Sequence, residues 1–124
     1  MRFMSIVSAP PSSYGKPTPA LMEAIGKLSE REIASGRMID TGGLVPLEQG
    51  ARVSVRKGEV VVQDGPFTEA KEVIGGYAVY AVKSKEEALE WTRRFLALHQ
   101  EHWKGWEGEV ELRQLYDMLG APTS

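Results

Sequence analysis

The chain of 124 residues contains no cysteine. It therefore lacks disulfides, thiolate nucleophiles and cysteine-ligated metal sites, which is consistent with a cytoplasmic protein. An excess of either charge is absent as well, because 15 lysines and arginines stand against 17 aspartates and glutamates, for a net charge of −2. Nucleic acids and anionic membranes attract basic surfaces, and this balance does not provide one. We expect a cytoplasmic protein that binds neither.

Long apolar runs and cofactor signatures are also missing. No segment is long enough to cross a bilayer, and residues 1–8 are too short and too weakly apolar for a signal peptide. The sequence has no glycine-rich phosphate loop, dinucleotide-binding fingerprint, nucleophile elbow or zinc signature. We therefore predict no cofactor and no metal. Length and composition indicate one domain, residues 1–124, in which residues 117–124 form a C-terminal tail.

The hydrophobic pattern alternates between the periods of strands and helices. Two helices are predicted: residues 19–35, with Thr18 as N-cap, and a second that starts at a capping box of Ser84 and Glu87. The predicted strands are residues 3–8, 73–82 and 109–115, together with a hairpin over 53–62 that turns at Lys57-Gly58, whereas residues 38–47 stay unassigned because Gly42 and Gly43 interrupt them.

This order of elements favours an α+β fold, a ferredoxin-like two-layer sandwich with a mainly antiparallel sheet. Two helices can cover only one face of such a sheet. Residues 73–82, however, are apolar on both faces, with Tyr77 on one and Tyr80 on the other. We expect a second copy to cover the free face, which gives a homodimer in the form of a dimeric α+β barrel.

The densest group of ionisable residues is the loop that runs from Asp64 to Glu72. Asp64 could act as a general base if burial raised its pKa, or it could stabilise its own turn. Gly65 is a turn former over which a ligand could also approach closely. Phe67 could anchor the loop or line a pocket, and Glu69 and Lys71 could bind a polar ligand or lie in solvent; the tyrosines at 77 and 80 are further pocket candidates.

The sequence Asp64-Gly65-Pro66-Phe67-Thr68-Glu69-Ala70-Lys71-Glu72 resembles the signature of the DGPF group within the YCII-related domain family. The resemblance extends over nearly the whole chain, through Thr18-Pro19, Gly42-Gly43-Leu44, Gly50-Ala51-Arg52-Val53, Gly75-Gly76-Tyr77, Lys83 to Ala88 and Glu111-Leu112-Arg113.

This resemblance implies a dimeric α+β barrel. Related YCII-type proteins include a dehydrochlorinase for which a histidine–aspartate pair in the cavity is the proposed catalytic unit. Asp64 matches the aspartate, but residues 14–18, where the histidine would stand, contain none. DGPF-type domains often occur beside extracytoplasmic-function sigma factors, which implies a possible functional association with one.

Other candidates have less specific signals. His99 and His102 could share a metal ion, but we expect both to be cations near the end of their helix. Trp91, Trp103 and Trp106 are interpreted as core and dimer contacts rather than as a ligand cage. Gly75-Gly76 indicates either a β-bulge or the close approach of a ligand or another backbone.

Two hypotheses follow for the function. The first is a homodimeric small-molecule binding or regulatory module whose cavity lies near the Asp64 loop. The alternative is a cofactor-independent lyase, isomerase or dehydrochlorinase-like enzyme, with Asp64 as general acid/base and Tyr77 or Tyr80 as its helper. The missing histidine favours the first, and whether the protein is an enzyme stays open.

Overall fold

The computed structural model describes residues 1–13, 15–65 and 73–124. In this part of the chain the predicted strands and helices are all present, and the unassigned segment proves to be a strand. The elements are β1 (Arg2–Ala9), η1 (Pro11–Ser13), α1 (Pro19–Ala34), β2 (Met38–Gly43), η2 (Leu47–Gln49), β3 (Ala51–Arg56), β4 (Glu59–Asp64), β5 (Val73–Ala81), α2 (Lys85–His102) and β6 (Glu109–Gln114).

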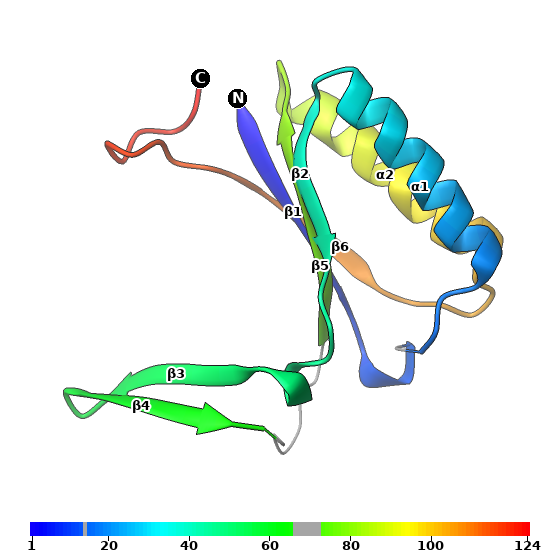
Figure 1. The fold of residues 1–124 in the computed structure, drawn as a ribbon. Helices are drawn as coiled ribbons and strands as arrows, with labels where there is room; N and C mark the ends of the chain where they lie inside the picture. The colour runs from blue at the N-terminus through cyan, green and yellow to red at the C-terminus, as the bar shows by residue number, and fades with distance from the viewer. Residues whose placement is uncertain (14, 66–72) are drawn as a thin grey trace.

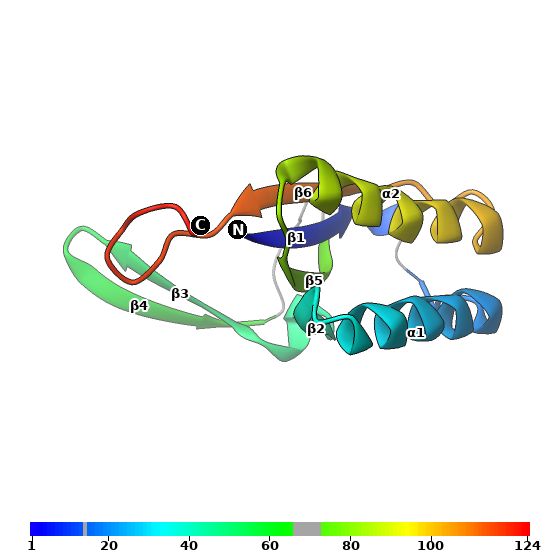
Figure 2. The same cartoon turned by 90° about the horizontal axis from the view of Figure 1, so that it is seen from above.

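Four strands form one antiparallel sheet in the order β2-β5-β1-β6. This order arises when two strand–helix–strand units interleave, and it confirms the predicted ferredoxin-like α+β fold. Both helices lie on the same side of the sheet, and β3 and β4 project from its opposite side (Figure 1). Seen from above, α1 and α2 run side by side (Figure 2).

Side-chain caps fix the start of each helix. The Thr18 hydroxyl accepts a hydrogen bond from the Leu21 N–H at 3.2 Å, and the Ser84 hydroxyl accepts one from the Glu87 N–H at 3.2 Å. The Glu87 carboxylate in turn accepts from the N–H of Lys83 at 3.1 Å, one residue before the N-cap. The predicted capping box is therefore present in a slightly widened form.

The two adjacent glycines of β5 are explained by both a bulge and a close backbone approach. Val7 pairs with Gly76 while Ser8 pairs with Ile74, so Gly75 is the extra residue of a β-bulge. A Cβ added to Gly76 would stand 2.9 Å from the backbone oxygen of Gly42 on β2. The backbone that approaches Gly76 so closely belongs to the neighbouring strand of the same chain.

β3 and β4 form a two-residue hairpin at the predicted turn. Lys57 and Gly58 have φ angles of 51° and 80°, the left-handed values that this turn needs. Because residues paired across two strands share a face, one face of the hairpin carries only valines at its centre. These are Val53, Val55, Val60 and Val62, and they are 64%, 73%, 70% and 64% exposed.

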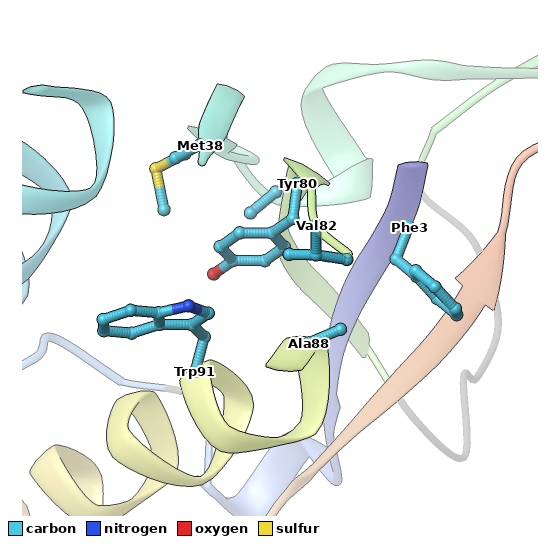
Figure 3. Packing of buried hydrophobic residues seen from close by; sticks show 7 residues of the cluster. Phe3, Met38, Tyr80, Val82, Ala88 and Trp91 are labelled. Atoms are coloured by element: carbon cyan, nitrogen blue, oxygen red, sulfur yellow. The ribbon is translucent and has the colours of Figure 1, made fainter. Parts of the chain in front are cut away.

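The hydrophobic core lies between the helices and the sheet. Met38, Tyr80 and Trp91 gather there with Val82 and Ala88 (Figure 3). Trp91 also lies under the guanidinium groups of Arg37 and Arg94, which stand 4.4 and 4.5 Å from its ring centre. The prediction that Trp91 belongs to the core is confirmed.

The segment after β6 folds back on the sheet. Tyr116 forms an isolated bridge with Pro122, and the buried Thr123 accepts a hydrogen bond from the Arg2 N–H at 2.8 Å. Of the described helices, neither α1 nor α2 is long and apolar enough to cross a membrane.

A candidate ligand-binding cavity

A cavity of about 320 Å³ lies between the sheet and the two helices. Pockets for small molecules start at about this size, and a cavity of about 150 Å³ already accepts benzene. Its walls come from the facing sides of all these elements. They include Ile25 and Leu28 of α1, Phe95 and His99 of α2, Val7 of β1, Ala78 and Tyr80 of β5, and Trp103 and Trp106 beyond α2.

The described walls carry hydroxyl groups, two indoles and one imidazole, but no carboxylate, ammonium or guanidinium group. The remaining surface is aliphatic, aromatic or glycine. An ionised ligand would therefore lose its hydration without gaining a partner of opposite charge from these walls. This lining favours uncharged and largely apolar ligands.

His99 is the most distinctive polar group of the cavity. It is 6% exposed, and its ring packs against Phe95 and Trp106 at centroid distances of 4.6 and 4.5 Å. Nδ1 lies 3.0 Å from the carbonyl oxygen of Phe95. A carbonyl can only accept, so Nδ1 carries the proton. Burial lowers the pKa of His99, although the bond to Phe95 partly opposes this shift, so the imidazole is neutral near pH 7.

Tyr80 faces the same cavity from β5 and is 5% exposed. Burial raises the pKa of its phenol, and the negative charge of Glu32 raises it further, while Ser5 has the opposite effect. Glu32 itself is buried in α1 and bound to Arg37 at 3.0 Å. The Tyr80 side chain is therefore an uncharged phenol at neutral pH.

Tyr77 lies on the other face of β5, as the alternation of the strand predicts. Its hydroxyl donates to Oδ2 of Asp40 at 3.1 Å, and this hydrogen bond raises the pKa of Tyr77. Thr41 ties the same region together, because its hydroxyl donates to the Tyr77 carbonyl oxygen at 3.0 Å. Tyr77 is one of the residues that line the cavity, and its hydroxyl is hydrogen-bonded to Asp40 of β2.

The candidates from the Asp64 loop lie elsewhere or outside the described residues. Asp64 is the exposed last residue of β4 and does not belong to the cavity lining. A Cβ added to Gly65 would stand 2.7 Å from the backbone oxygen of Glu48, so this glycine permits a close approach within the chain. Phe67, Glu69 and Lys71 lie outside the described residues.

Sequence reasoning misjudged one residue of the cavity. His99 was expected to be a cation near the end of its helix, but burial keeps it neutral. Trp103 and Trp106, interpreted as core and dimer contacts, pack against each other and also line the cavity. The sequence pattern did indicate that His99 is buried, because His99 continues the buried face of α2 through Ala88, Thr92 and Phe95 at helical spacing. In the described ranges, no group of three acidic or histidine side chains could hold a metal.

Comparisons with known proteins identify the family of the chain. A family model described as the YCII-related domain matches residues 1–104. An uncharacterized protein of Rhizobium meliloti (strain 1021) is similar to the chain, with 30% identity over 73 residues. This match spans 59% of the chain and 59% of the relative's own length. Because the family model covers well over half of the sequence, the chain belongs to the YCII-related domain family.

Proposed function

We propose that the protein is a homodimeric module that binds an uncharged, largely apolar small molecule in the cavity between its sheet and its helices. The observation that carries this proposal is the cavity of about 320 Å³ whose described lining has no ionised side chain. A concave apolar space with a few polar groups is the usual form of a small-molecule site. A regulatory role would follow if ligand binding changed the contacts of the dimer.

The argument for a homodimer comes from the apolar surfaces that are exposed in the single chain. The four valines of the hairpin face lie in solvent, and Ile74 at the start of β5 is 53% exposed. The sheet face away from the helices adds Met4, Ile6 and Val79, which are only partly covered. An apolar sheet face together with an apolar hairpin beside it is typical of an interface with a second copy.

Binding rather than catalysis is the better-supported activity. Proton transfer by Asp64 would require its carboxylate to reach a ligand, and Asp64 lies exposed at the end of β4, away from the cavity lining. The described cavity walls supply hydrogen-bonding groups and apolar contacts. These are sufficient for recognition.

A cavity-filling substitution tests the proposal. We would titrate the protein with 2-methoxynaphthalene and measure binding by calorimetry and by the rise of the unfolding midpoint, since a ligand that binds the folded state stabilises it. Ile25→Phe places a larger side chain on the cavity wall and should abolish this stabilisation. Ile33→Phe is the matched control, because Ile33 lies on the same helix, is 55% exposed and is outside the cavity lining.

Equal binding by the wild type and by Ile25→Phe would show that the ligand binds elsewhere. Absence of binding by the wild type, over a panel of apolar aromatic compounds of one or two rings, would overturn the proposed function.

A further inference from the structure

The two nitrogens of His99 have different roles. Nδ1 donates to the carbonyl oxygen of Phe95, four residues earlier in the same helix. The neutral imidazole then carries its lone pair on Nε2. Among the described residues, the hydrogen bond of this ring is the one from Nδ1 to the Phe95 carbonyl oxygen.

The position of His99 makes this lone pair available to a ligand. The ring belongs to the cavity wall and lies against the rings of Phe95 and Trp106. An acceptor of this kind, set among flat apolar rings, recognises a donor at the edge of an aromatic molecule.

We infer that the cavity binds an uncharged aromatic molecule carrying a hydroxyl group, and that this hydroxyl donates a hydrogen bond to Nε2 of His99. The inference rests on the proposed function and names the chemical class of the ligand. The aromatic walls favour a flat ring system, the uncharged lining disfavours carboxylates, and the volume fits roughly one or two rings. His99 therefore selects for a hydroxyl among ligands of similar shape.

Three probes of nearly the same shape separate these features: 2-naphthol, 2-methoxynaphthalene and 2-naphthoate. The first has a hydroxyl donor, the second has the same ring without a donor, and the third is charged. Calorimetry should show 2-naphthol binding about fivefold to tenfold more tightly than its methyl ether, as expected for one hydrogen bond. The charged naphthoate should bind most weakly of the three.

The variant His99→Phe removes the acceptor and keeps a ring in its place. It should bind 2-naphthol and 2-methoxynaphthalene equally well, which closes a double-mutant cycle between the ligand hydroxyl and the imidazole. His102→Phe is the matched control, since His102 lies in the last turn of the same helix but outside the cavity lining, and it should keep the preference for 2-naphthol.

A measurement on the wild type guards against a variant that fails to fold. In protein labelled with ¹⁵N at histidine, the Nε2 resonance of His99 should move on addition of 2-naphthol. It should move much less with 2-methoxynaphthalene, and the His102 resonances should stay in place. These shifts report the hydrogen bond directly.

The alternative outcomes are distinct. Equal binding of 2-naphthol and its ether by the wild type, with no shift at Nε2, overturns the role of His99 and leaves the apolar cavity as a binding site. Tightest binding of 2-naphthoate overturns the uncharged ligand class. If none of the three binds the wild type, the inference fails, and the panel described for the proposed function then decides whether the cavity binds any apolar ligand.

Discussion

The hydroxyl of Thr18 donates a hydrogen bond to the carbonyl oxygen of His102 at 2.7 Å. The hydroxyl oxygen also accepts from the Leu21 N–H, so one side chain caps the start of α1 and satisfies the end of α2. The Leu21 N–H and the His102 carbonyl are both backbone groups without partners inside their own helices. Thr18 thereby holds together two helix ends beside the cavity.

We expect Thr18→Val to lower the free energy of unfolding by about 1–2 kcal/mol, because it keeps the shape but loses both hydrogen bonds. Thr18→Ser should be close to the wild type. Thr18→Asp separates the two roles, since aspartate can cap α1 but cannot donate to His102. Its free energy of unfolding should lie between those of the Val and Ser variants. Urea denaturation measures all three. A Val variant as stable as the wild type would contradict this assignment.

Two glycine-to-alanine substitutions should change the stability of the protein in opposite directions. A Cβ at position 76 would press on the backbone oxygen of Gly42, so Gly76→Ala should destabilise the protein by about 1–3 kcal/mol. Gly26, in the middle of α1, has open space where a Cβ would stand, and Gly26→Ala should stabilise by about 0.5–1 kcal/mol. Thermal unfolding distinguishes the two. A neutral Gly76→Ala would mean that β2 and β5 can move apart at little cost.

Stability should depend on pH through His99. Burial lowers its pKa in the folded state below the ordinary 6.5 to which it returns on unfolding. Below that value the unfolded chain binds a proton that the folded chain excludes. The contribution of neutral His99 is therefore complete above about pH 6.5 and is lost as the pH falls toward the folded pKa.

The measurement is the unfolding midpoint of the wild type, His99→Phe and His102→Phe between about pH 7.5 and about pH 5. The wild type and His102→Phe should lose more stability over this range than His99→Phe does. Parallel curves for all three proteins would show that His99 is not the group that titrates.

The hairpin face predicts the oligomeric state. We expect a dimer at micromolar concentration, and we expect Val55→Lys together with Val62→Lys to dissociate it, because both side chains already lie in solvent in the single chain. Ser54→Lys adds one lysine to the opposite face of the hairpin and should leave the dimer intact. Light scattering after gel filtration measures the molar mass of the wild type and of the variants. A wild-type monomer would contradict the proposed assembly.

Local chemistry explains which parts of the fold were predictable. The caps formed by Thr18 and Ser84 and the turn at Lys57-Gly58 involve backbone groups within a few residues, so these roles are readable from sequence. The bond from Thr18 to His102 joins distant segments and is not. The strand β2 was missed because its glycines are tolerated only through pairing with β5, a contact between distant segments.

The cavity was harder to predict than the fold. Tyr77 and Tyr80 were assigned to opposite faces correctly, but the sequence does not say on which side of a sheet space is left unfilled. His99 was missed because a polar residue late in a helix is usually solvated. Its burial depends on Trp106, which reaches the ring from the segment beyond α2.

The strand order also bears on how the chain folds. The central strand β1 pairs with β5 and β6, so Phe3 must find both Tyr80 and Gln114 before the sheet exists. The β3–β4 hairpin, by contrast, closes through a turn of two residues. Loop closure between distant segments is slow, whereas hairpins form in about 1–10 μs. The valine-faced hairpin should therefore form before the sheet that it projects from, so that encounter between chains can begin while each is still incompletely folded.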